Sequence, residues 1–173
     1  MPLEQEVKIM DDYMYLQQMR FGQRIKYMCD VDKECMDELV PAFVLQPLIE
    51  NAIIHGLSSS SKGGLIYVRC FKKEDKMWLS VADTGIGIER DKLKNIRRYI
   101  DNIFLSPDTK PAATAENDNK SDADNGIKRK TVGVGIGNIA YRIKGMYNNS
   151  GIKIYSVKDR GTVIQIFFDN YSK

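Results

Sequence analysis

Four strand-like runs occur in two close pairs, and this pairing limits the possible folds more than any other feature of the sequence. The first pair covers residues 65–71 and 77–82, separated by the polar stretch 72–76. The second pair, 152–157 and 162–168, closes the chain. Strands joined by so few residues pair as antiparallel hairpins, because a parallel pair needs a long crossover connection. The sequence therefore predicts a mainly antiparallel sheet.

Stretches with helical periodicity accompany these strands. Apolar residues recur in steps of three and four up to about Arg20, and an alternating pattern then predicts a strand over 25–31. Further helices are expected from Pro41, which suits a first helical turn, over 89–104 and over 138–147. This mixture favours an α/β fold of the α+β two-layer kind, a sandwich with helices on one face of a mixed, mainly antiparallel sheet.

The composition changes abruptly after the third helical stretch. Between 106 and 126 alanine and proline are the only apolar residues, so this segment cannot bury enough surface to offset the entropy of ordering it. A long stretch of this kind within a compact domain is functional or disordered. We therefore expect one domain over 23–173 with a flexible lid insertion at about 106–130, preceded by a helix within 1–22.

Charge and composition exclude several classes of protein. A net charge of +3, from 26 basic and 23 acidic residues, is too balanced for a nucleic-acid surface. The sequence has three cysteines without a C-x-x-C pair and one histidine, which argues against a zinc site. No apolar run is long enough to span a bilayer. We expect a cytosolic domain with free thiols that binds no nucleic acid.

The first of three short motifs lies in residues 46–56, QPLIENAIIHG. Glu50, Asn51 and His55 are polar residues on a helix otherwise patterned for burial. Positions 51 and 55 are one turn apart and share a face. The amide oxygen of an asparagine can bind Mg²⁺, which takes few protein ligands beside phosphate oxygens. An exposed helix edge with three polar groups would explain the same pattern.

The second motif, DTGIGI at 83–88, directly follows a strand-like run. The carboxylate of Asp83 only accepts hydrogen bonds, which suits an exocyclic amine such as that of adenine. Gly85 and Gly87, next to Ile88, permit positive φ and close approach of the backbone to a flat ring. An ordinary turn leading into a helix fits the motif equally well.

The third motif, GVGIGN at 133–138, opens a helix. Glycine-rich helix starts present backbone N–H groups to phosphates. Residues 135–140 also satisfy the loose dinucleotide pattern G-x-G-x-x-A, with Asp159 at a tolerable distance. That alternative lacks the preceding strand and the parallel βαβ unit it requires. A P-loop is excluded, because the chain contains no Gly-Lys pair.

The order and spacing of these motifs resemble the family of histidine kinases, DNA gyrase B subunits, large heat-shock chaperones and mismatch-repair ATPases. The phrase LQPLIENA at 45–52, Arg20-Phe21 before the first strand, and Asn138-Ile139 with Arg142 are similar to sensor histidine kinases of the LytS and YesM type. The resemblance covers nearly the whole chain and implies a Bergerat-type ATP-binding fold with ATP and Mg²⁺ as ligands.

The resemblance also implies a role for each motif. Asn51 would bind the Mg²⁺ that bridges the ATP phosphates, Asp83 would accept the adenine amine, and the glycines at 133, 135 and 137 would hinge the lid. The residues expected to contact the nucleotide are Asn51, His55, Asp83, Gly85, Gly87, Ile88, Gly133, Gly135, Gly137 and Thr162.

Two positions depart from the family pattern. Ile54 stands where many relatives carry a lysine, which removes one expected phosphate contact. Pro47 stands where gyrase-like members place a glutamate that activates water, and Glu50 is instead adjacent to Asn51. The second departure disfavours a free-running ATPase.

The resemblance implies the catalytic domain of a protein histidine kinase in two-component signalling. Residues 1–22 resemble the tail of the dimerisation region that follows the phosphoacceptor histidine, and the single histidine, His55, belongs to the first motif. We therefore expect Mg-ATP binding without autophosphorylation. The implied partners are an upstream phosphoacceptor-helix domain and a response regulator. The whole protein would be a membrane-anchored homodimer, and this chain would be its cytoplasmic domain at a bacterial inner or plasma membrane.

Three other functions remain open at this point. One is a non-catalytic nucleotide sensor of the same fold, which Ile54 and the long lid would suit. A serine-directed anti-sigma-type kinase would share the fold but not the wording of the first motif. A nicotinamide-cofactor enzyme is disfavoured by the missing βαβ context.

Overall fold

The computed structural model describes residues 1–58, 63–106 and 134–169 of the chain. Within these ranges five strands form one sheet in the order β1-β2-β3-β5-β4. The strands are β1 (Ile25–Val31), β2 (Gly64–Lys73), β3 (Lys76–Asp83), β4 (Ser150–Val157) and β5 (Gly161–Asp169). Only β1 and β2 pair in parallel, and the other neighbours are antiparallel. The predicted mixed, mainly antiparallel sheet is therefore confirmed.

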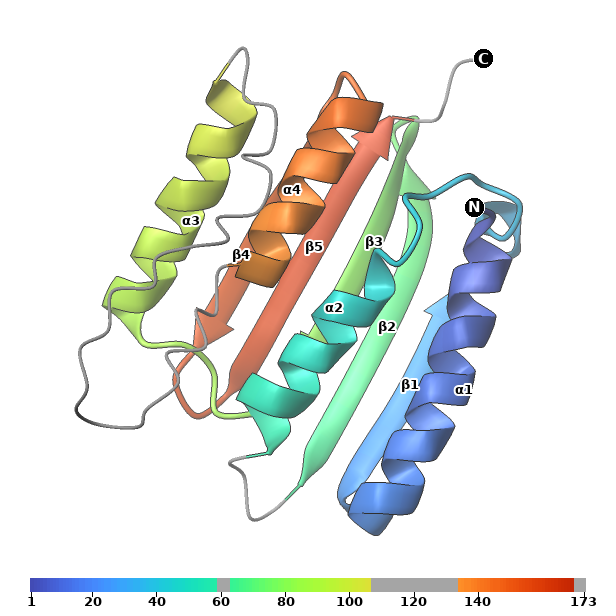
Figure 1. The fold of residues 1–173 in the computed structure, drawn as a ribbon, viewed down its shortest axis with the longest axis vertical. Helices are drawn as coiled ribbons and strands as arrows, with labels where there is room; N and C mark the ends of the chain where they lie inside the picture. Colours follow the sequence, from blue (N-terminus) through green and yellow to red (C-terminus); the bar gives the residue numbers. More distant parts are fainter. Residues whose placement is uncertain (59–62, 107–133, 170–173) are drawn as a thin grey trace, which may run out of the picture.

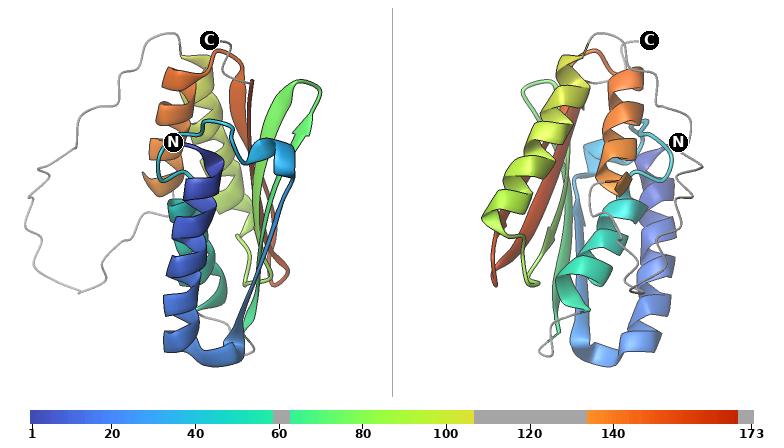
Figure 2. Two further views of the ribbon diagram at one scale, coloured as in Figure 1. Left: turned by 90° about the vertical axis from the view of Figure 1, so that its right-hand side faces the viewer. Right: turned by 60° about the vertical axis from the view of Figure 1, so that its left-hand side comes forward.

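The helices lie side by side on one face of this sheet in the order α1-α2-α4-α3 (Figure 1). They are α1 (Leu3–Phe21), α2 (Leu45–Asn51), α3 (Arg90–Leu105) and α4 (Val134–Met146). Two short 3-10 turns, η1 (Gly22–Arg24) and η2 (Lys33–Cys35), flank β1. Figure 2 shows the helix layer and the sheet as two separate layers, which confirms the predicted two-layer α/β fold. No helix of the described ranges is both long and apolar enough to cross a membrane.

The core lies between the two layers. On α3 the apolar side chains recur every three or four residues, so they form one buried stripe. On the strands alternate side chains point into the same core, and each large one that is fully buried contributes about 1.5–3 kcal/mol to folding. The residues of these two sets are Leu93, Ile96, Ile100 and Ile103 on α3, and Ile25, Ile66, Val68, Cys70, Met77, Leu79, Val81, Ile152, Ile154, Ile164, Ile166 and Phe168 on the sheet.

The first hairpin turns more tightly than the polar stretch 72–76 suggested. Glu74 and Asp75 both adopt left-handed backbone conformations, with φ of 54° and 58°. Two such residues form the turn that matches the twist of an antiparallel pair. Lys73 therefore pairs directly with Lys76, and both strands extend beyond their predicted ends.

Two predicted helix starts are wrong. The helix expected from Pro41 begins at Leu45, because Phe43 has a left-handed φ of 56° that no helix can include. Pro47, not Pro41, lies in the first turn of α2, where a missing backbone N–H costs no hydrogen bond. The helix expected from 138 begins at Val134, so that Gly135 lies in its first turn.

The helix α2 continues without a break into η3 (Ala52–Leu57), a π-helical segment. The amide of Ser58 donates to the carbonyl of Ile53, at 2.8 Å, and the Ser58 hydroxyl donates to the same oxygen at 2.7 Å. Such wide turns are rare and are frequently found at functional sites. Here the wide turn covers the second half of the first motif.

The predicted lid at about 106–130 lies, except for Ser106, outside the described residues. The same holds for Gly133. Both expectations stay predictions.

Candidate functional site

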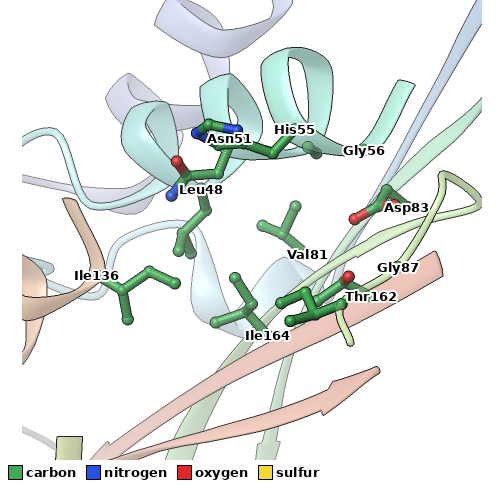
Figure 3. A pocket seen from close by; sticks show the side chains of 12 residues that line it. Leu48, Asn51, His55, Gly56, Val81, Asp83, Gly87, Ile136, Thr162 and Ile164 are labelled. Carbon is green, nitrogen blue, oxygen red and sulfur yellow. The ribbon is translucent and has the colours of Figure 1, made fainter. Parts of the chain in front are cut away.

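A hollow lies between the helix formed by α2 and η3 and the strands β3 and β5 (Figure 3). Its walls bring together residues from all three motifs and from the last strand. The lining residues are Leu48, Asn51, Ala52, His55, Gly56, Val81, Asp83, Gly87, Ile88, Ile136, Thr162 and Ile164. Of the residues predicted from the sequence to contact a nucleotide, this set contains Asn51, His55, Asp83, Gly87, Ile88 and Thr162.

Asp83 is the last residue of β3 and pairs with Thr162 of β5, so both side chains reach the hollow from the sheet. The Gly85 amide donates a hydrogen bond of 2.8 Å to Asp83 Oδ1. Burial raises the pKa of the Asp83 carboxyl, and hydrogen bonds from the backbone amides of Gly85 and Thr162 oppose that rise. The result is a half-buried carboxylate with remaining acceptor capacity at the edge of an apolar hollow.

The glycines of the second motif have different tasks. Gly87 lines the hollow with a φ of 66°, as the motif predicted, and a side chain there would overlap the backbone of Val157. Gly85 does not line the hollow. It packs against the backbone of Gly56, and the Ile86 amide donates to the Gly56 carbonyl at 3.0 Å. Gly85 therefore lets the second motif pack directly against the helix.

Ile88 is held by a residue that the sequence analysis missed. The hydroxyl of Ser156 on β4 accepts a hydrogen bond from the Ile88 amide at 2.8 Å and lies 2.9 Å from Thr162 Oγ1. It also lies 2.9 Å from the Gly161 carbonyl, to which it donates. Serines on strands are common, so the sequence pattern does not single out Ser156. Its role becomes visible only in the fold, where β4 lies beside the second motif.

Asn51 ends α2 and faces the hollow from the helix layer. Its Nδ2 is buried and has no hydrogen-bond partner among the described residues. A buried amide left unpaired costs about 1–3 kcal/mol, so a group that pairs with it would gain from binding. Since the amide oxygen and nitrogen exchange places by a flip of the side chain, the same position can offer an oxygen to a divalent cation. Asn51 thus fits the predicted Mg²⁺ ligand.

Two glycines of the third motif, Gly135 and Gly137, lie in different surroundings. Gly135 faces Asn51, because a Cβ on Gly135 would lie 3.6 Å from Asn51 Nδ2. Gly135 lines a neighbouring hollow together with residues of α2 and α4, namely Pro47, Asn138, Tyr141 and Arg142. Gly137 is buried elsewhere, against Tyr99 of α3, where a Cβ would lie 2.6 Å from the hydroxyl. Of these two, the structure therefore brings only Gly135 to the site.

Apolar side chains form the walls between these polar groups. Figure 3 shows Leu48, Val81, Ile136 and Ile164 around the hollow below the helix that carries Asn51 and His55. For Leu48, Val81 and Ile164 the periodicity of the sequence predicted burial but could not distinguish a packed core from the wall of a pocket. An apolar slot with a carboxylate on one side and an amide on another suits a flat base with an exocyclic amine.

The two-layer fold and this hollow define a nucleotide-binding domain, and a comparison with known families identifies which one. The family described as histidine kinase-, DNA gyrase B- and HSP90-like ATPase matches residues 36–172. The chain belongs to this family of ATP-binding domains.

Individual relatives are consistent with that assignment. Over 94 residues the chain is 36% identical to the sensor protein LytS of Staphylococcus saprophyticus, a stretch that covers 54% of this chain and 16% of that protein. It is also 29% identical over 94 residues to the sensor histidine kinase YpdA of Escherichia coli, which again covers 54% of this chain and 16% of that protein. The chain thus spans a small part of the length of these relatives.

Among solved structures, the histidine kinase domain of the blue-light activated kinase from Erythrobacter litoralis EL346 is similar in fold. The TM-score is 0.59 at 15% sequence identity, and the match covers 98% of this chain and 62% of that chain. At this identity the similarity supports the fold alone.

Proposed function

We propose that this chain is the ATP-binding catalytic domain of a two-component sensor histidine kinase. The observation that carries the proposal is the placement of Asp83 and Asn51 on two sides of one apolar hollow. The similarity to LytS and YpdA supports a kinase over the other ATPases of the family.

In the proposed binding mode the adenine amine donates to Asp83, and the ring lies between the apolar walls formed by Val81 and Ile164. Thr162 and Ile88 border the ring, and His55 lines the hollow beside Asn51. The phosphates extend towards Gly135, where the N-terminal amides of the 13-residue helix α4 favour negative charge. Asn51 would hold Mg²⁺, which neutralises charge on the phosphate oxygens.

In the proposed reaction an imidazole nitrogen of a histidine on the upstream domain attacks the γ-phosphorus. The bond from that phosphorus to the bridging oxygen breaks, and ADP leaves. The residues of this chain bind and orient the nucleotide, which is most of what phosphoryl transfer requires. No residue needs to activate water. Accordingly Glu50, beside Asn51, accepts a hydrogen bond from Gln46 at 3.0 Å and does not line the hollow.

The same proposal includes the context of the domain. Residues 1–22, mostly α1, would be the tail of the dimerisation region, and a response regulator would receive the phosphoryl group. The whole protein would be a membrane-anchored homodimer with this domain on the cytoplasmic side of a bacterial membrane, and nucleic acid would not be a partner.

Calorimetric titration with ATP, with and without Mg²⁺, tests the nucleotide site. We expect micromolar binding, about −8 kcal/mol, and a loss of roughly ten-fold or more in the Asp83→Asn variant, since a hydrogen bond to a charged group contributes about 1.5–3 kcal/mol. Asp75→Asn at the exposed tip of the first hairpin is the matched control and should bind ATP like the wild type. Absence of ATP binding to the wild-type chain would refute the proposal.

A second measurement separates a kinase from a nucleotide sensor. The domain is mixed with labelled ATP and a separately produced phosphoacceptor-helix domain of a LytS-like kinase. Acid-labile phosphate on that acceptor, dependent on Asn51, supports transfer. Nucleotide binding without any transfer to a matched acceptor would favour the sensor.

A further inference from the structure

The turn that leads into α2, residues 42–45 including the first helical residue, is held by side chains from two other helices. From α1, the Glu6 carboxylate accepts hydrogen bonds from the backbone amides of Phe43 and Leu45, the latter at 3.3 Å. From α4, the Arg142 guanidinium donates to the carbonyl of Ala42 at 2.6 Å and to that of Phe43 at 3.3 Å. We call residues 42–45 the clamped turn.

Glu6 is fully buried, which is unusual for a glutamate. Burying a carboxylate is costly unless hydrogen bonds compensate it. Burial raises the pKa of the Glu6 carboxyl, while the amides of the clamped turn and the charge of Arg142 oppose the rise. Since α2 has no side-chain cap of its own, Glu6 supplies from another helix the acceptor that the free amides at its start require.

Phe43 shows that the clamped turn depends on these contacts. Its φ of 56° is a left-handed conformation that a bulky residue rarely adopts. Its side chain is 51% exposed, so packing of the ring does not hold it. Strained backbone of this kind persists where the surroundings hold it in place. Here the surroundings are Glu6 on one side and Arg142 on the other.

The clamped turn leads directly to the nucleotide site. The seven-residue helix α2 starts at Leu45 and ends at Asn51, so that a shift of the turn moves Asn51 with it. Arg142 lies on the helix whose first turn places Gly135 opposite Asn51. The two helices that border the proposed phosphate region, α2 and α4, are therefore both attached to the clamped turn.

We propose that Glu6 and Arg142 are positioning residues, which through the clamped turn set the place of Asn51 and couple the docking of α1 to nucleotide binding. The inference rests on the proposed function, in which the hollow binds ATP. It gives α1 a defined effect on the site: when Glu6 leaves the turn, α2 loses the acceptor for its first amides, and Asn51 is no longer held against Gly135.

The test compares Glu6→Gln with two controls on the same helix. Gln keeps the size of the side chain but offers one acceptor oxygen in place of two and no charge. Glu4→Gln makes the same change at an exposed position, and Met14→Ala removes buried apolar volume from α1 about two helical turns away from Glu6. ATP affinity is measured by calorimetry well below the melting temperature of each variant, and the side-chain amide signal of Asn51 is followed by NMR without nucleotide.

We expect Glu6→Gln to weaken ATP binding about ten-fold or more and to shift the Asn51 amide signal. Met14→Ala should lower the melting temperature and Glu4→Gln should leave it unchanged, both with wild-type affinity and an unshifted Asn51 signal. Arg142→Gln should act like Glu6→Gln, and the double variant should lose less than the sum of the two single losses, because the residues hold the same turn. If Glu6→Gln does not fold, Arg142→Lys, which keeps the charge but loses the two-pronged contact, replaces it.

A Glu6→Gln variant that binds ATP as the wild type does, or that behaves like Met14→Ala, would overturn the inference. The NMR measurement separates this outcome from failure of the proposed function. If the wild-type chain does not bind ATP, the proposed function fails, and an unshifted Asn51 signal in Glu6→Gln would then still decide against the positioning role.

Discussion

Gly56 of η3 and Asp83 of β3 lie in direct contact at the edge of the hollow. A Cβ on Gly56 would lie 2.7 Å from Asp83 Oδ1 and 2.9 Å from its carboxyl carbon. The helix can therefore approach the carboxylate only because position 56 has no side chain. Gly56 belongs to the first motif, but the sequence pattern indicates no role for it.

Replacing Gly56 by alanine should displace the Asp83 carboxylate and weaken ATP binding by roughly ten-fold, the value of one hydrogen bond to a charged group. Gly145→Ala is the matched control, because a Cβ there meets nothing within 4 Å. Alanine in a helix is favoured over glycine by about 0.5–1 kcal/mol, so the control should raise stability and leave ATP binding unchanged. Calorimetry and thermal unfolding measure both effects. Equal ATP affinity in the two variants would contradict the contact.

The half-buried Asp83 carboxyl should give the domain a characteristic pH dependence. Its pKa is raised from the ordinary value of 3.8, so the folded state favours the protonated form. The resulting stabilisation is complete below pH 3.8 and disappears as the pH rises through the raised pKa. Relative to Asp83→Asn, wild-type stability should therefore fall from acid towards neutral pH. Denaturant unfolding at a series of pH values measures the difference, and a constant difference would argue against it.

ATP binding should show the opposite trend with pH, because only the ionised carboxylate accepts a hydrogen bond without offering one. Affinity should decrease as the pH falls, starting above the ordinary aspartate pKa, and the decrease should be absent in Asp83→Asn. The ATP phosphates titrate equally in both experiments, so the difference in affinity between the wild type and Asp83→Asn reports on Asp83 alone. A parallel decrease in both proteins would mean that Asp83 is not the group responsible.

Gly137 should matter for packing between α3 and α4. A Cβ there would lie 2.6 Å from the hydroxyl and 2.8 Å from a ring carbon of Tyr99, so Gly137→Ala should destabilise the fold by about 1–3 kcal/mol. Tyr99→Ala in the same chain should recover part of this loss, because it vacates the space. Thermal unfolding of the single and double variants tests the contact. Loss of ATP affinity without loss of stability would instead favour a phosphate contact for Gly137.

Ser156→Ala should destabilise the domain by about 1 kcal/mol, since the Ile88 amide loses its acceptor. Because Ile88 and Thr162 both line the hollow, ATP affinity should fall by a few-fold as well. Ser150→Ala, on the same strand, removes a hydroxyl that donates to the Tyr147 carbonyl at 3.2 Å and should leave ATP binding unchanged. If both serine variants bind ATP equally, the role of Ser156 at the site is refuted.

Much of the fold could be predicted because its information is local. The strands of the two hairpins show a hydrophobic period of two residues, and α3 shows a period of three to four. These patterns depend only on neighbours in the chain. The site motifs were found for the same reason. Asp83 follows a strand and Asn51 and His55 share one face of a helix, so that each motif shows its geometry within a few residues.

Contacts between distant residues decided the rest. The helix start at Leu45 differs from the one predicted at Pro41 because Glu6, 37 residues from Phe43, and Arg142, 99 residues from Phe43, hold the turn in a left-handed conformation. The parallel pairing of β1 with β2 joins two consecutive strands that are separated in the chain by η2, α2 and η3.

The sequence by itself therefore determined which elements form, how the hairpins pair, and which short motifs carry polar groups and glycines. Tertiary structure alone decided that Gly56 makes room for the Asp83 carboxylate, that Ser156 holds Ile88, and that Gly137 lies against Tyr99. Local backbone preference and side-chain periodicity extend over a few residues. Where a carboxylate lies, and where only a glycine fits, depends on which distant element packs against that position.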